Sequence, residues 1–138
     1  SPAWSPNGDD VAFIGRPMVD DARTSPLAGP AQIWLWSADD AAPRLLSAAA
    51  PGANRLLWAP DGTSLLVLSR ERSLPGRGGV SAASILLLDP ETGRVRPLAE
   101  GIAAATSSWA PAWSPDGTWL AWVDSPGDVV LRSVAGTE

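Results

Sequence analysis

The stretch AWSPDGTWLAWVD at residues 112–124 decides the fold, because two related copies precede it in the same chain. The copies read AWSPNGDDVAFIG at 3–15 and LWAPDGTSLLVLS at 57–69, so the element recurs after 54 and then 55 residues. Each copy joins a tryptophan, a Pro-Asn-Gly or Pro-Asp-Gly turn and an apolar run. A recurrence of this kind indicates a repeat architecture.

Each copy predicts a tight hairpin. Proline fixes φ at the turn, and glycine accepts the positive φ that other residues resist. The run after the turn is apolar on both of its faces, which is typical of a strand sandwiched between two layers. The expected strands lie near 10–14, 32–37, 64–70, 84–89, 94–98, 119–124 and 128–134.

A looser unit follows each hairpin, at 32–47, 84–99 and 128–138, and supplies two further strands. Each repeat then forms a four-stranded antiparallel sheet with two apolar faces, so the sheets must pack face to face. This predicts an all-β fold, a β-propeller sector of three blades whose last blade is incomplete. A β-sandwich does not explain the recurrence, and a helical solenoid does not fit the period of two. The repeats are approximately 1–50, 51–106 and 107–138 of one segment, 1–138.

Composition excludes several functions. The 138 residues contain no His and no Cys, which excludes His-based triads, His metal sites and thiolate chemistry within the chain. No Gly-x-Ser-x-Gly element is present, so no catalytic residue, metal or cofactor is expected here. Ten cations, all Arg, against 15 acidic residues give a net charge of −5, which argues against nucleic acid as a partner. The apolar runs are too short for a membrane span.

The Ser-Pro-Asp-Gly turn, the apolar strand and the Ile-Trp strand that follow it resemble the TolB-type, WD40-like propeller repeat. The sequence is also similar to LpqB-type lipoprotein propellers and to the propeller of prolyl-oligopeptidase-like peptidases. The resemblance implies a ring of about six blades and a location outside the cytoplasm, in the periplasm or at the cell surface as a lipoprotein. Three blades are fewer than a closed ring needs. We therefore expect either a longer parent chain that supplies the other blades or a homo-oligomer that closes the ring.

The two end blades should each expose an apolar face. We expect Phe13, Ile14 and Trp34 to be bare on the first blade, and Trp119, Trp122 and Val129 to be bare on the last. Bare apolar faces and unpaired edges favour association. The isolated chain should therefore self-associate.

Two sets of recurring residues have a functional and a structural interpretation. Asn7, Asp61 and Asp116 could bind Ca²⁺ through oxygen atoms, but turn hydrogen bonds are the favoured interpretation. The repeated Trp4, Trp58 and Trp113 could stack on a sugar or peptide, but their recurrence favours packing between blades. Trp119 does not recur, so packing and binding are equally open for it.

The connections between the second and third strands differ in length more than any other part of the repeat. They span about 15–30, 71–83 and 124–127, and in a propeller they share one face. Long loops of this kind bind partners or are tolerated insertions. The candidate partner-binding residues are Arg16, Asp20, Asp21, Arg23, Arg70, Glu71, Arg72, Arg77 and Trp119.

Two functions follow. The first is a non-catalytic scaffold that binds a protein or peptide through this loop face, where Arg can clamp carboxylates. The alternative is the substrate-gating propeller of a serine peptidase whose catalytic domain lies outside these 138 residues.

Overall fold

The computed structural model describes residues 2–15, 31–47, 52–70, 82–103, 110–124 and 127–134. Within these ranges every regular element is a β-strand and none is a helix. The first sheet consists of β1 (Pro2–Trp4), β2 (Asp10–Gly15), β3 (Gln32–Ser37) and β4 (Arg44–Ser47). The second consists of β5 (Ala53–Trp58), β6 (Leu65–Arg70), β7 (Ala82–Leu88) and β8 (Val95–Ala103). The third consists of β9 (Ala112–Trp113), β10 (Trp119–Asp124) and β11 (Asp128–Ser133).

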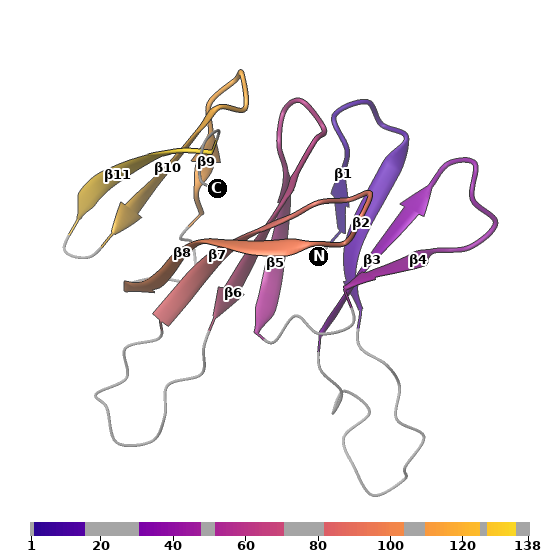
Figure 1. The fold of residues 1–138 in the computed structure, drawn as a ribbon, viewed down its shortest axis with the longest axis horizontal. Helices are drawn as coiled ribbons and strands as arrows, with labels where there is room; N and C mark the ends of the chain where they lie inside the picture. Colours follow the sequence, from indigo (N-terminus) through magenta and orange to yellow (C-terminus); the bar gives the residue numbers. More distant parts are fainter. Residues whose placement is uncertain are drawn as a thin grey trace, which may run out of the picture.

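Every strand pairs antiparallel with its sequence neighbour, so each sheet is a meander. The three sheets stand side by side like the blades of a fan, with their hairpin turns along one edge (Figure 1). The structure confirms the prediction of an all-β propeller sector and most of the predicted strand positions. β8 is longer than expected, because after bulges it pairs again with the start of β7.

The hairpin turns have the predicted backbone. Gly62 and Gly117 both have φ of +74°, a conformation that glycine adopts without a steric penalty. The turns of neighbouring blades also lie close together. A Cβ on Gly117 would lie 3.5 Å from the Asp61 carboxylate.

Each blade has two different faces. We call the face that carries the tryptophan of its first strand the tryptophan face, and the other the back face. The first apolar core lies between the back face of the first blade and the tryptophan face of the second, and the next core repeats this arrangement one blade further on. The first core contains Ala12, Ile33, Leu35, Leu46, Leu56, Leu65, Val67 and Leu88. The second contains Leu66, Leu68, Ile85, Leu87, Leu98, Leu120 and Trp122.

The structure corrects three expectations about exposure. Ile14 packs against the first core and Trp122 is only 5% exposed in the second, although both were expected on bare faces. The register explains this, because alternate residues of a strand point to opposite faces and these two point toward the middle blade. Trp4 was expected in the core but is 68% exposed. It lies on the tryptophan face of the first blade, and no described blade stands in front of that face.

Candidate functional site

The edge that carries the connections β2–β3, β6–β7 and β10–β11 was predicted to bind a partner. Of the nine candidate residues, only Arg70 is described there. It ends β6, is half-buried, and its main-chain N–H donates to the Gly52 carbonyl at 2.9 Å. Seven candidates lie outside the described residues: Arg16, Asp20, Asp21, Arg23, Glu71, Arg72 and Arg77.

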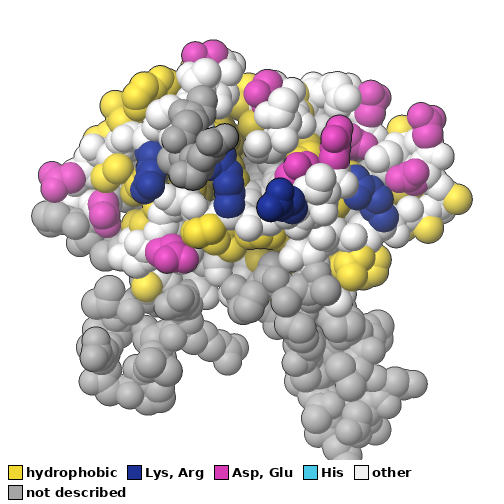
Figure 2. All heavy atoms as spheres, in the orientation of Figure 1, with side chains coloured by type: hydrophobic (Ala, Val, Ile, Leu, Met, Phe, Trp, Pro, Cys, Tyr) yellow, Lys and Arg dark blue, Asp and Glu magenta, His cyan; other side chains and the backbone are white. Residues whose placement is uncertain are grey.

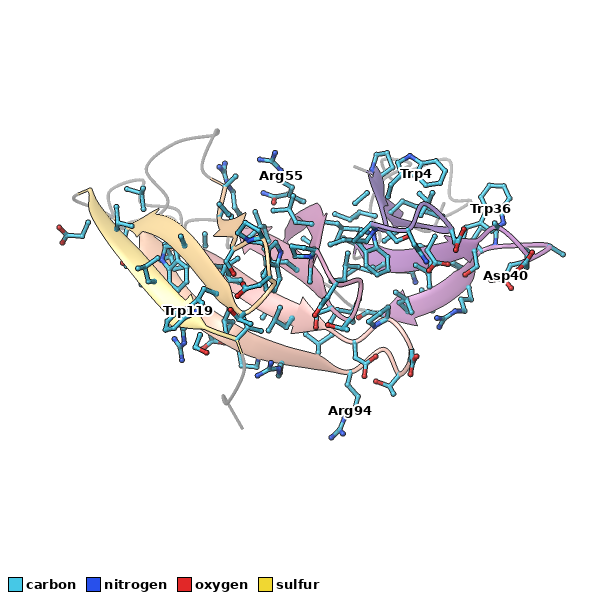
Figure 3. All side chains as sticks on the ribbon, turned by 90° about the horizontal axis from the view of Figure 1, so that it is seen from above. Trp4, Trp36, Asp40, Arg55, Arg94 and Trp119 are labelled. Atoms are coloured by element: carbon cyan, nitrogen blue, oxygen red, sulfur yellow. The ribbon has the colours of Figure 1, made fainter. Side chains whose placement is uncertain are left out.

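Trp119 lies elsewhere. It begins β10, next to the hairpin turn, and therefore occupies the edge opposite to Arg70. Its side chain is half exposed, on the back face of the third blade (Figure 3). The structure thus does not bring Trp119 together with Arg70.

The hairpin-turn edge is polar, and its side-chain oxygens accept hydrogen bonds within their own turns. The side-chain oxygens of Asn7, Asp61 and Asp116 each accept a hydrogen bond from the main-chain N–H two residues later, at 3.3, 3.0 and 3.1 Å. These contacts support the prediction that the three residues serve the turns. Among the described residues, no cluster of three or more acidic side chains is arranged to hold a metal ion.

One of these turns lowers the pKa of its aspartate. The Ser114 hydroxyl donates to the Asp116 carboxylate, and the N–H of Thr118 adds a second bond. Chiefly through the Ser114 bond, the pKa of Asp116 falls from 3.8 to about 2. In the turn between β7 and β8, the N–H of Glu91 similarly lowers the pKa of Asp89. Both carboxylates are therefore held ionised by their own turns, which fits a structural role.

Hydrogen bonds between blades form a second set of polar contacts, which the sequence analysis did not identify. The Trp58 indole N–H donates to the Ala3 carbonyl at 3.0 Å. Arg44 of β4 donates to the Pro90 carbonyl at 2.6 Å, and Arg96 of β8 donates to the Val134 carbonyl at 3.3 Å. Arg44 and Arg96 hold equivalent places in their repeats, so aligning 44–47 with 96–99 would have revealed this pattern.

Basic side chains recur across one face of the molecule. Figure 2 shows them in a spaced row over the outer strands, with acidic side chains around them. Two of the arginines on these outer strands, Arg44 and Arg96, already hold neighbouring blades together.

No protein-family model matches the chain. Several solved structures, however, match the chain. Over its whole length the chain superposes on TolB from Acinetobacter baumannii with a TM-score of 0.64 at 18% identity. The fold is that of a TolB-type β-propeller. The same TolB-type sector matches the acylaminoacyl peptidase of Pyrococcus horikoshii with a TM-score of 0.65 at 15% identity over 97% of the chain.

Two further matches carry more sequence similarity. An oligogalacturonate lyase, solved in complex with manganese, matches 91% of this TolB-type sector with a TM-score of 0.56 at 26% identity. The "uncharacterized peptidase YuxL" of Bacillus subtilis is 27% identical over 86% of the chain. The chain spans 20% of YuxL and 23–30% of the three solved chains. None of the described segments forms a helix long and apolar enough to cross a membrane.

Proposed function

We propose that this chain is a non-catalytic propeller sector that binds a peptide or protein along the edge of the β2–β3, β6–β7 and β10–β11 connections. One contrast supports the proposal: the polar side chains of the hairpin-turn edge are used within their own turns. The faces between neighbouring blades, in turn, are used for packing. The connections that follow β2 and β6 contain Arg16, Arg23, Arg72 and Arg77 in the sequence, and Arg70 ends β6 at this edge.

Arginine gives this edge a defined chemistry. Its planar guanidinium donates two parallel hydrogen bonds to a carboxylate and also reaches peptide carbonyls. We therefore expect a ligand with a free or side-chain carboxylate, held by Arg70 and by the predicted Arg16, Arg23, Arg72 and Arg77.

A binding experiment on the full 138-residue chain tests this. The probes are fluorescein-labelled peptides of matched sequence with a free or an amidated C-terminus, followed by fluorescence anisotropy. We expect the free-acid peptides to bind more tightly, and Arg70→Ala combined with Arg72→Ala to weaken that binding about tenfold or more, as for the loss of charge-assisted bonds. Arg94→Ala is the control, because Arg94 is exposed beside the turn between β7 and β8, at the opposite edge. Equal loss in the control, or no preference for the free acid, contradicts the proposal.

A second function has a specific observation in its favour. YuxL, which aligns with most of this chain, is described as a peptidase, and a solved peptidase shares the fold. In that function the sector would gate access to a serine peptidase domain encoded elsewhere in the same gene. The sequence that follows residue 138 distinguishes the two: a hydrolase domain with a Gly-x-Ser-x-Gly nucleophile favours the peptidase, and further propeller repeats followed by a stop favour the scaffold.

We also propose a location outside the cytoplasm, which the TolB-type fold suggests. Fractionation of cells that produce the full parent protein, with antibodies against residues 82–103, tests this location. Recovery with cytoplasmic markers alone would contradict it.

A further inference from the structure

Two adjacent polar side chains, Asn54 and Arg55, lie on the first strand of the middle blade. We call the side of the molecule on which the first strands β1, β5 and β9 lie the hub side. The first strands approach each other there, since Trp58 of β5 donates to the Ala3 carbonyl of β1. Arg55 projects from this side, whereas Arg94 projects from the opposite one (Figure 3). Both Asn54 and Arg55 are exposed, although the second blade has a described blade on each side.

A β-bulge explains why these two side chains point the same way. The pairing of β5 with β6 shifts between Ala53 and Arg55. Ala53 and Leu56 both lie in the first core, although residues three positions apart face opposite sides of a regular strand. One extra residue in the strand accounts for this. Asn54 and Arg55 therefore share the other side of β5, which faces the third blade.

The fold does not require this polar pair. Ala110 holds the place of Arg55 in the third repeat and is also exposed, so a small apolar side chain is sufficient there. Arg44 and Arg96 donate to carbonyls of neighbouring blades, but neither Asn54 nor Arg55 makes a side-chain hydrogen bond or ion pair with the residues that the structure describes. The strands β1, β5 and β9 carry no acidic side chain. Arg55 thus has no counter-ion within the described ranges.

The pair lies close to the edge at which we propose that a partner binds. β5 begins at Ala53, and the carbonyl of the preceding Gly52 accepts a hydrogen bond from the main-chain N–H of Arg70 at 2.9 Å. Arg55 pairs with Leu68, two residues before Arg70. Arg55 therefore lies where the hub side meets the edge of the β2–β3, β6–β7 and β10–β11 connections.

We propose that Arg55 and Asn54 bind the C-terminal carboxylate of the peptide partner, an inference that rests on the proposed function. The guanidinium donates two parallel hydrogen bonds to a carboxylate, and the Asn54 amide donates a third. A chain end suits this place better than the middle of a segment. The first strands converge on the hub side, and a chain end needs a path in but none out. Arg70 then contacts the residues that precede the terminus.

Fluorescence anisotropy with the full 138-residue chain tests this with three peptides labelled at the N-terminus. One has a neutral sequence and a free C-terminal acid, the second is the same peptide amidated, and the third is amidated and ends in Glu. We expect the free acid to bind most tightly. Arg55→Ala should weaken its binding about tenfold and leave the amidated neutral peptide unchanged. The loss in Asn54→Ala should be about threefold, because a neutral donor is removed.

Two further variants separate geometry from charge. Arg55→Lys keeps the charge but not the planar fork, so it should retain only part of the preference for the free acid. Arg94→Ala is the matched control, because it removes an exposed arginine from the opposite side (Figure 3). Urea unfolding of every variant should match the wild type, as expected for exposed positions.

The outcomes separate this inference from the proposed function. If Arg55→Ala keeps the preference for the free acid while Arg70→Ala combined with Arg72→Ala weakens binding, the inference is overturned and the proposed function stands. Equal weakening of the acid and the amide by Arg55→Ala, or equally tight binding of the Glu-ended amide, also overturns it. If the wild type shows no preference for the free acid, the proposed function fails, and this inference fails with it.

Discussion

The two interfaces between blades use the same positions of the repeat, but they differ in their hydrogen bonds. At the first, the Trp58 indole reaches the Ala3 carbonyl and Arg44 reaches the Pro90 carbonyl at 2.6 Å. At the second, Arg96 reaches the Val134 carbonyl at 3.3 Å, and the buried indole nitrogens of Trp113 and Trp122 have no hydrogen-bond partner among the described residues. A buried donor without an acceptor costs free energy. The apolar pattern is thus sufficient to stack the blades, whereas the polar contacts determine how firmly each one is held.

The described part of the third blade has three strands, and Val129 and Leu131 of β11 are exposed there. Because the second interface contains two buried indoles without a partner among the described residues, we expect the third blade to open before the first two. Native structures commonly open in such local units.

The largest effect is expected at two neighbouring leucines of β6. Leu65 and Leu66 are both fully buried, but Leu65 faces the first blade and Leu66 the third. Each change to Ala should cost about 2–5 kcal/mol of unfolding free energy, because it leaves a cavity. Hydrogen exchange should show that Leu66→Ala exposes the amides of β10 while β2 and β3 stay protected. Loss of protection in all blades at once in both variants would contradict the difference between the interfaces.

A smaller effect is expected at Gly93, where the second blade approaches the first closely. Gly93 has φ of +73°, and a Cβ there would lie 2.5 Å from the Leu46 carbonyl oxygen. Gly93→Ala should destabilise the chain by about 2–4 kcal/mol, from strain and displacement of the first blade. Gly8→Ala is the control, because Gly8 has a similar φ of +79° and nothing within 4 Å of a Cβ. Equal costs in urea unfolding would mean that the close approach is unimportant.

The indole hydrogen bond gives a third comparison. Trp58→Phe removes the donor to Ala3, whereas Trp113→Phe removes a donor that has no partner within the described part of the chain. Both variants lose similar apolar volume. Trp58→Phe should therefore cost about 1 kcal/mol more than Trp113→Phe in chemical unfolding. A larger loss of unfolding free energy in Trp113→Phe than in Trp58→Phe would mean that the Trp113 indole finds an acceptor in solution.

The smallest expected effect is on the acid stability of the third blade. The pKa of Asp116 is lowered from 3.8 to about 2, mainly by the Ser114 hydroxyl. A lowered folded-state pKa means that the ionised form adds stability above about pH 4, and that this stability is lost as the pH falls toward 2. Asp116→Asn should lower Tm slightly at neutral pH and match the wild type near pH 2. Asn7 fills the equivalent place in the first blade, so the turn accepts Asn. A Tm difference that is the same at both pH values would contradict this role.

Several features were predictable from local sequence. The Pro-Asn-Gly and Pro-Asp-Gly turns at 6–8, 60–62 and 115–117 fix the hairpins, and their glycines have positive φ as expected. The apolar runs 64–70 and 84–89 were assigned to strands because such sequences suit a buried sheet. The functional assignments of Asn7, Asp61 and Asp116 to turns also followed from chemistry within a few residues.

Tertiary structure decided everything that depends on which blade lies next to which. Sequence alone showed that Trp4, Trp58 and Trp113 are equivalent, and it predicted one environment for all three. In the structure Trp4 is exposed, the Trp58 indole donates to the Ala3 carbonyl, and the Trp113 indole has no partner in the segments that the structure describes. The physical reason is that a repeat encodes its own strands and turns through neighbours in the chain. The burial of a blade face and the partner of an indole depend on a sheet about 50 residues away.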